Sequence, residues 1–248
     1  MRTSQIKHNE LALELPLIAD LNLRVSRKAK YAQLKVLYDG RVELVVPQKY
    51  PRARLLQFVQ ENQTWLQNAL DKYHQHKQAD PHRFSQFPEF IDLAAIGEYW
   101  TVEYQMAESN RIRTQTQLFP HLLVSSQSPQ QRIPLLKNWL SRKAKQALIP
   151  WFDDVSRTIG LNYNRVSIRG QKTRWGSCSN EKNISLNRCL LFLPAHLVEY
   201  VFIHELCHTQ YLNHSKIYWQ LVSRFDNGYR KHEKQLNQYS GKIPLWVV

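Results

Sequence analysis

The chain has 248 residues, which is enough for one large domain or two small ones with packed apolar cores. Hydrophobic residues make up 43% and aromatic residues 11% of the sequence, which excludes an intrinsically disordered chain. No apolar run approaches the roughly 18 to 20 residues that cross a bilayer, and the N-terminal stretch lacks a signal-peptide cleavage site. The count of 3 cysteines is odd. We therefore expect a cytoplasmic protein with reduced thiols and no membrane partner.

The net charge of +14 is distributed unevenly along the chain. Residues 1–134 contain 17 Lys and Arg against 13 Asp and Glu, whereas residues 135–248 contain 17 against 7. The region 137–188 alone holds 11 basic and 3 acidic residues. Such a region can attract nucleic acid or another polyanion, and it can equally be a solvated surface, because bulk charge specifies no partner.

The first part of the chain predicts β-strands followed by one helix. Apolar and polar residues alternate in three runs, at 21–25, 34–38 and 42–46. The pair Asp39-Gly40 between the second and third runs is typical of a hairpin turn. From Pro51 the apolar spacing changes to a helical stripe, which predicts one helix over about 51–77.

A polar, Pro-containing stretch at 125–134 marks the expected domain boundary. We expect a β-rich N-terminal region over 1–134 and a second domain over 135–248 that begins with a long amphipathic helix. Pro150 should kink or divide this helix, and Gly160 should end it. Three short strands and a helix that starts at Pro194 then complete an α+β fold.

Residues 204–214 read HELCHTQYLNH and contain the pattern H-E-x-x-H. Positions i and i+4 of a helix lie on one face, so His204 and His208 can direct two imidazoles at one metal ion. Glu205 sits next to that face and can reach a water molecule bound to the ion. The surrounding segment is apolar, and unpaired polar groups buried there would be costly, which favours a metal site over histidines on a surface helix.

A catalytic zinc ion usually has three protein ligands and one open position. His214 is the candidate for the third ligand, but a continuous helix would carry it roughly 240° around from His208. The helix must therefore stop first, and Asn213 is the candidate for that break or for the cap of the next helix. Cys207 falls on a different face of the helix, so we expect a core residue there rather than a ligand.

Residues 174–222 resemble the YgjP-like metallopeptidase family, whose relatives are the SprT-like and WLM-type zinc proteases. The resemblance implies a zincin-like domain, in which an active-site helix packs on a small sheet. It also implies that His204, His208 and His214 bind one catalytic zinc ion and that Glu205 is the general base. The similar segments are RWGSC at 174–178, ISLN at 184–187, the H-E-x-x-H helix, and NHS at 213–215 followed by Trp219.

The sequence leaves the surrounding roles open. Arg174 and Trp175 are candidates to bind substrate along a cleft, and equally candidates to hold the fold together. Tyr211 and Tyr218 are further candidates to contact substrate. Together with Arg174 and His232, these two tyrosines are also the candidates for a donor that stabilises the oxyanion.

Three hypotheses about function follow. The first is a zinc-dependent metallopeptidase that hydrolyses a protein or peptide by a metal-activated water, with Glu205 as general base. The second is a metal-dependent nucleotide phosphohydrolase, such as a pyrophosphatase, that holds phosphates with the basic region 137–188. The chain has only 7 glycines and no phosphate-binding Gly-rich loop, which disfavours this hypothesis. The third is a nucleic-acid-associated module with structural zinc, which does not require an acid beside an open metal position.

Overall fold

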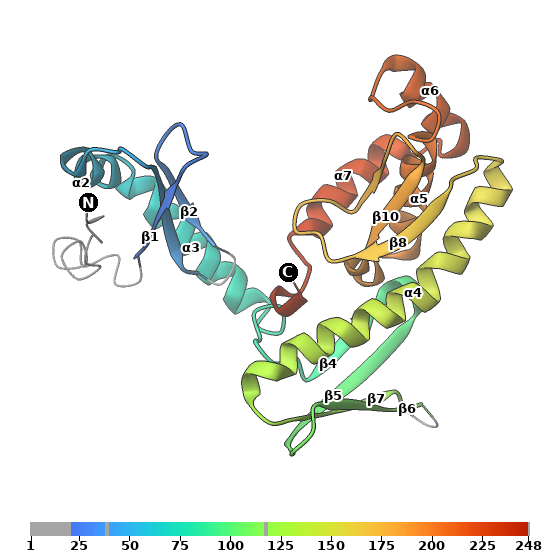
Figure 1. The fold of residues 1–248 in the computed structure, drawn as a ribbon, viewed down its shortest axis with the longest axis horizontal. Coiled ribbons are helices and arrows are strands. Elements are labelled where there is room, and N and C mark those ends of the chain that lie inside the picture. The colour runs from blue at the N-terminus through green and yellow to red at the C-terminus, as the bar shows by residue number, and fades with distance from the viewer. Residues whose placement is uncertain (1–20, 38–39, 117–118, 248) are drawn as a thin grey trace. The chain divides into compact units, whose positions relative to one another are not determined.

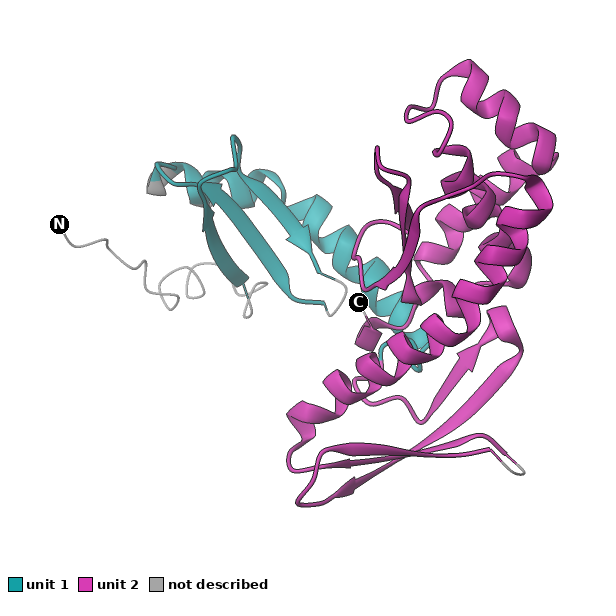
Figure 2. Ribbon diagram, turned by 45° about the vertical axis from the view of Figure 1, so that its right-hand side comes forward, with its two compact units in different colours: residues 1–84 teal, residues 85–248 magenta. Residues whose placement is uncertain are grey.

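Figure 1 shows the chain as a computed structural model, which describes residues 21–37, 40–116 and 119–247. The chain divides into two compact units, Met1–Phe84 and Ser85–Val248, which have different colours in Figure 2. Helices and strands are mixed in both units, so the fold is α+β, as expected. Within the described ranges, no helix combines the length and the apolar character that crossing a membrane requires.

The first unit is a three-stranded sheet with two helices. Its elements are β1 (Leu21–Ser26), β2 (Gln33–Val36), β3 (Val42–Pro47), α2 (Arg52–Glu61) and α3 (Gln63–Ala79). The central strand β3 is parallel to β1 and antiparallel to β2. Every second residue of β3 faces the helices, so Leu44 is fully buried in one apolar cluster with Leu55, Val59 and Leu66. The three predicted strands are therefore confirmed.

The helix predicted over 51–77 is divided in two at Asn62. The side-chain Nδ2 of Asn62 donates a hydrogen bond to the carbonyl oxygen of Phe58 at 2.8 Å. An asparagine that binds the backbone of the preceding turn competes with continuation of the helix. At the predicted hairpin, β2 and β3 pair as expected and Gly40 has a left-handed φ of +85°, while Asp39 lies outside the described residues.

The second unit begins with a four-stranded sheet in the order β4-β5-β7-β6, against which the longest helix packs (Figure 1). Its elements are β4 (Phe90–Leu93), η1 (Ala94–Ile96), β5 (Glu98–Met106), β6 (Arg111–Gln115), β7 (His121–Ser126), η2 (Pro129–Gln131) and α4 (Arg132–Ile159). The rings of Trp100 in β5 and Trp139 in α4 meet edge to face, with centroids 5.2 Å apart. Sheet and helix therefore share one apolar core.

This shared core explains why the units divide at Phe84 and not at the expected boundary between 134 and 135. The buried face of the sheet, with Leu122 and Val124 fully enclosed, packs in the same cluster as Leu136 of α4. A sheet that depends on a helix for burial cannot form a separate domain from it. The polar stretch 125–134 thus contains the end of β7, a short connection and the start of α4.

Pro150 lies inside α4, which runs as one helix from Arg132 to Ile159. The proline ring is exposed, and α4 continues past it despite the backbone hydrogen bond that a proline cannot donate. Of the two expected outcomes, a kink or a division of the helix, the division is therefore wrong. Gly160 ends α4 with a left-handed φ of +70°, as predicted.

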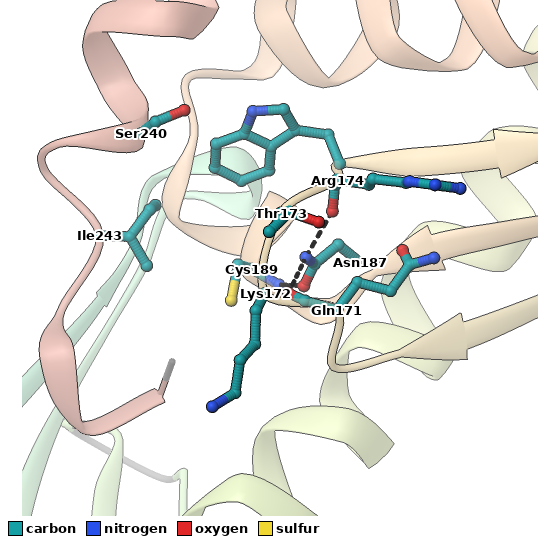
Figure 3. Close-up of a pocket in the computed structure, with 9 residues that line it drawn as sticks. Gln171, Lys172, Thr173, Arg174, Asn187, Cys189, Ser240 and Ile243 are labelled. Carbon is teal, nitrogen blue, oxygen red and sulfur yellow. Dashed lines mark hydrogen bonds between the residues drawn. The ribbon is translucent and has the colours of Figure 1, made fainter. Parts of the chain in front are cut away.

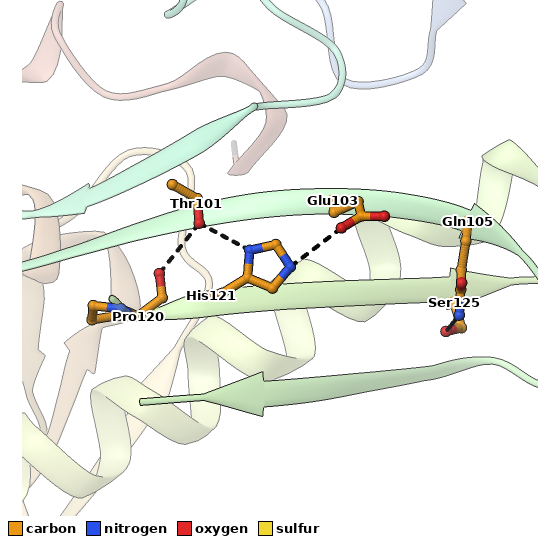
Figure 4. A network of polar contacts seen from close by, with 6 residues as sticks. All are labelled: Thr101, Glu103, Gln105, Pro120, His121 and Ser125. Carbon is orange, nitrogen blue, oxygen red and sulfur yellow. Dashed lines mark hydrogen bonds and ion pairs between the residues drawn. The ribbon is translucent and has the colours of Figure 1, made fainter. Parts of the chain in front are cut away.

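The other face of the four-stranded sheet carries a row of polar side chains (Figure 4). His121 lies between Thr101, whose Oγ1 is 2.9 Å from its Nδ1, and Glu103, whose Oε2 is 3.5 Å from its Nε2. Further along the same pair of strands, the amide of Gln105 donates to the hydroxyl of Ser125 at 2.8 Å. These cross-strand pairs link β5 to β7 on the face opposite the apolar core.

The rest of the second unit is a three-stranded sheet and three helices. Its elements are β8 (Arg165–Arg169), β9 (Gly176–Cys178), β10 (Asn183–Asn187), η3 (Arg188–Phe192), α5 (Ala195–Cys207), α6 (Lys216–Phe225), α7 (Tyr229–Ser240) and η4 (Leu245–Val247). Strand β10 is central, parallel to β8 and antiparallel to β9, which is therefore an edge strand. The helix predicted to start at Pro194 is α5, with Pro194 as its N-terminal cap residue.

Phe152 in the middle of α4 connects the long helix to α5. Its ring is fully buried and meets the rings of Phe202 and Tyr163 edge to face, with centroids 5.1 and 5.0 Å away. We expect Phe152→Ala to lower the free energy of unfolding by about 3 to 5 kcal/mol, because it leaves a cavity at this junction. Urea denaturation measures the loss. The exposed Phe119 is the matched control, and equal losses for Phe119→Ala and Phe152→Ala would contradict the role of this junction.

Candidate metal centre

The side chains of His204, His208 and His214 converge at the C-terminal end of α5. The Nε2 atom of His204 is 3.3 Å from Nε2 of His208 and 3.2 Å from Nε2 of His214. One nitrogen from each of the three rings lies within 4.8 Å of the others. In the part of the chain that the structure describes, this is the one group of three or more His, Cys, Asp or Glu side chains with such spacing.

The chain turns sharply between His208 and His214. This turn is the one that the sequence requires for His214 to reach the other two histidines. Helix α5 ends at Cys207 with His208 as its cap residue, earlier than the expected break at Asn213. The side-chain oxygen of Asn213 instead accepts from the backbone N–H of Ser215 at 3.3 Å. The hydroxyl of Ser215 then caps α6 by accepting from the N–H of Tyr218 at 3.4 Å.

The distances from Nε2 of His204 to the other two rings fit a small tetrahedral metal ion. Two ligand atoms held about 2.0 to 2.1 Å from such an ion lie roughly 3.3 to 3.4 Å apart. The tautomer of His208 fits as well, because its Nδ1 lies 3.0 Å from the carbonyl oxygen of Tyr211, which can only accept. The proton of the neutral ring is therefore on Nδ1, and Nε2 keeps a lone pair for a metal ion.

Burial keeps the imidazoles of His204 and His208 neutral, which is the form that binds metal. Burial, reinforced by the charges of His208 and His214, lowers the pKa of His204 to about 3. Burial likewise lowers the pKa of His208. The Nδ1 atom of His204 is buried and has no hydrogen-bond partner among the described residues, so binding through Nε2 is the strong polar interaction open to this ring.

Two aromatic rings of α6 hold the histidines in place. Tyr218 is fully buried, stacks on His208 with centroids 4.5 Å apart, and donates its hydroxyl to the carbonyl oxygen of His204 at 3.1 Å. Trp219 stacks on His214 with centroids 5.4 Å apart. The hydroxyl of Tyr218, a sequence candidate for contact with substrate, is thus engaged with the backbone of α5. The backbone carbonyl oxygen of Tyr211 accepts a hydrogen bond from His208, while the side chain of Tyr211 is exposed.

Glu205 is buried beside the three histidines, and its Oε2 atom has no hydrogen-bond partner among the described residues. Burial raises the pKa of this carboxyl to about 8, and the positive charge of Arg174 opposes the rise. The carboxylate packs directly on β9, since a Cβ added to Gly176 would lie 2.5 Å from Oε1 of Glu205. Only glycine leaves room for Glu205 in this position, and sequence reasoning did not single out this requirement.

A loop between β8 and β9 carries the predicted residues Arg174 and Trp175. The amide of Asn187 holds it, donating to the carbonyl oxygens of Gln171 and Arg174 at 2.7 Å each (Figure 3). The loop borders a pocket of about 270 Å³, and Figure 3 shows the Arg174 side chain directed away from Ser240 and Ile243. Trp175 lines this pocket and also a second one beside Glu205.

Two other candidate residues lie outside the group of three histidines. The Nδ1 atom of His232 is 2.7 Å from Oδ2 of Asp226, and its ring centroid is 6.1 Å from that of Tyr200. His232 is therefore oriented by a carboxylate but is separated from His204 by the Tyr200 ring. Cys207 is fully buried in the apolar core, as expected, and burial raises the pKa of its thiol to about 12.

The two opposite pKa shifts predict the pH dependence of the metal-free protein. Glu205 binds its proton more tightly folded than unfolded, so its contribution to stability is lost as pH rises towards about 8. The lowered pKa of His204 affects the free energy of unfolding only below pH 6.5, the ordinary pKa of a histidine. Between pH 6.5 and 8 we expect the free energy of unfolding to fall by roughly 2 kcal/mol. Denaturation of chelator-treated protein measures this fall, and the same slope in Glu205→Gln would refute the assignment.

Comparison with known proteins identifies the family. The family model described as "YgjP-like, metallopeptidase domain" matches residues 30–239, which include the three histidines, Glu205 and the β9 edge. No curated protein and no solved structure matches the chain. The match covers most of the sequence, and the description implies a hydrolase that works with a divalent metal ion. The chain therefore belongs to the YgjP-like family of metallopeptidase domains.

Proposed function

We propose that the protein is a zinc-dependent peptidase that hydrolyses peptide bonds in a protein or peptide substrate. The observation that carries the proposal is the convergence of three imidazoles beside a buried carboxylate. His204, His208 and His214 would hold the ion, and three imidazole ligands with an open position are the donor set of catalytic zinc. When bound, zinc makes a water molecule more acidic and stabilises negative charge on the carbonyl oxygen of the substrate.

Glu205 acts as the general base in this proposal. Its carboxylate accepts a proton from the attacking water and delivers it to the nitrogen of the leaving amine. Burial supports this role, because it brings the pKa of the carboxyl from its ordinary range to about 8, close to the pH at which the proton must be both taken and released. The contact with Gly176 holds the carboxylate against β9.

The edge strand β9 is the proposed docking site for the substrate backbone. Among the strands of the described residues, only β10 pairs with it, which leaves its other edge next to Glu205 without a strand partner. An extended peptide can add to such an edge as a further strand, which would bring its carbonyl groups past the metal site. An active-site helix beside the edge of a small sheet is the arrangement of a zincin-like domain, which we propose for residues 135–248.

One observation favours a second candidate function, the hydrolysis of nucleotides. Arg174 provides a positive charge near Glu205, as shown by its effect on the pKa of that carboxyl, and a phosphate group could use it. Peptide hydrolysis remains the better proposal because it uses the free strand edge as well as the metal site. Phosphate release from nucleoside triphosphates distinguishes the two.

The Glu205→Gln variant tests the proposed function. We expect the native chain to bind one zinc ion and cleave casein or a peptide library, and Glu205→Gln to keep its zinc while losing about 10²- to 10⁴-fold in rate. Metal analysis of both proteins and a cleavage assay on the same substrates measure this. Loss of phosphate release in the variant, without any peptide cleavage by the native chain, would replace the proposal by the nucleotide reaction. A native chain without stoichiometric metal would overturn both.

Gly176→Ala tests the position of the base without changing any ionisable group. The added methyl group would collide with Glu205 and displace its carboxylate, so we expect at least a 10-fold loss of peptidase activity with zinc affinity retained. Gly241→Ala is the control, because a Cβ there meets its nearest atom at an ordinary 3.5 Å. Full activity in Gly176→Ala would show that the contact with β9 does not position the base.

A further inference from the structure

A second pocket opens directly beside the metal site. It has a volume of about 200 Å³ and lies between α5, α7 and β9. His204 and Glu205 form part of its lining, so a group bound in it would lie next to the reacting bond. We call it the α5–α7 pocket, and its other lining residues are Trp175, Gly176, Tyr200, Val201, Glu233, Leu236 and Asn237.

Part of the wall of the α5–α7 pocket is apolar. Tyr200, Val201 and Leu236 are buried core residues, and Trp175 packs against the same core. These side chains offer a slot for an unbranched aliphatic chain, such as the methylene groups of lysine or arginine, which cover apolar surface while the charged end stays polar.

The charged groups of this pocket are acidic. Glu233 lies on α7 and makes no ion pair with any described residue, and Asn237 adds an amide oxygen one turn further along the helix. The negative charge of Glu233 reaches the pocket wall, because it helps to raise the pKa of Tyr200 and of Tyr218. No lysine or arginine lines the pocket. A chain with a net charge of +14 thus has, beside its three histidines, a pocket that Glu233 lines with an exposed carboxylate.

We propose that the α5–α7 pocket selects peptide substrates with a lysine or arginine next to the cleaved bond, and that Glu233 is the residue that determines this specificity. The inference rests on the proposed peptidase function and narrows its substrate class. The aliphatic stem would lie along Tyr200 and Leu236, and the cationic end would meet the carboxylate of Glu233. An acidic residue at the same substrate position would face Glu233 and be rejected.

The test uses fluorogenic peptides that differ only at one position, scanned along both sides of the cleaved bond. Lysine, arginine, norleucine and glutamate are compared there, since norleucine has the stem of lysine without its charge. We expect the zinc-loaded native chain to prefer lysine over norleucine by about 5- to 10-fold in kcat/KM at one position. Glu233→Gln should bring this ratio close to 1, and Glu233→Lys should favour glutamate. Glu199→Gln, an exposed carboxylate of α5 outside the pocket, should keep the native ratio.

The outcomes separate this inference from the proposed function. Peptide cleavage without a preference for lysine or arginine at any position would overturn the inference and leave the peptidase proposal intact. A preference that persists in Glu233→Gln would assign the specificity to another site. If no peptide is cleaved, the peptidase proposal fails and the inference with it. Fluorescence anisotropy of the same peptides on zinc-loaded Glu205→Gln gives a second readout, and equal affinity for lysine and norleucine peptides would also overturn the inference.

Discussion

Helix α5 is packed against α4, α6, α7 and the edge strand β9, and this enclosure is the constraint on which the site depends. Eight of its thirteen residues are buried, including Glu205. Because the helix cannot rotate or slide without opening the core, His204 and His208 present their imidazoles in one fixed direction. The ring of Phe152 on α4 supports this helix from the side away from the histidines through its contact with Phe202.

The enclosure of α5 also changes the pKa values of its ionisable side chains. A buried carboxyl and buried imidazoles are disfavoured in their charged forms, so the pKa of Glu205 rises and that of His204 falls. Neutral imidazoles are metal ligands, and a carboxyl with a pKa near neutrality can exchange a proton at working pH. The burial that holds the fold together is thus also the physical cause of the shifted pKa values of Glu205 and His204.

The net charge of the whole chain and the charge in the α5–α7 pocket have opposite signs. The chain as a whole is strongly basic, which favours the approach of acidic partners at long range. In the α5–α7 pocket beside the three histidines, Glu233 contributes an exposed carboxylate. At short range a local carboxylate outweighs a diffuse charge that solvent and salt screen, so the pocket and the surface can select different groups.

The features that depend on neighbours in sequence could be predicted from the sequence alone: the alternating strands of the first unit, the helix that begins at Pro194, and the spacing of His204, His208 and His214. Turn chemistry was predicted less well, since α5 ends at Cys207 and not at Asn213. The family resemblance carried by these local motifs was also correct. These features follow from backbone periodicity and residue type, which are properties of the local sequence.

Only the tertiary structure decided which distant segments meet. It joined the sheet at 90–126 to α4 in one core, which moved the division between units to Phe84. It placed Gly176 against Glu205, turned the hydroxyl of Tyr218 to the backbone of α5, and brought Glu233 to the same pocket as the metal site. Such contacts depend on how apolar faces are buried against one another, and that is set by the whole chain at once and has no periodic signature in any one segment.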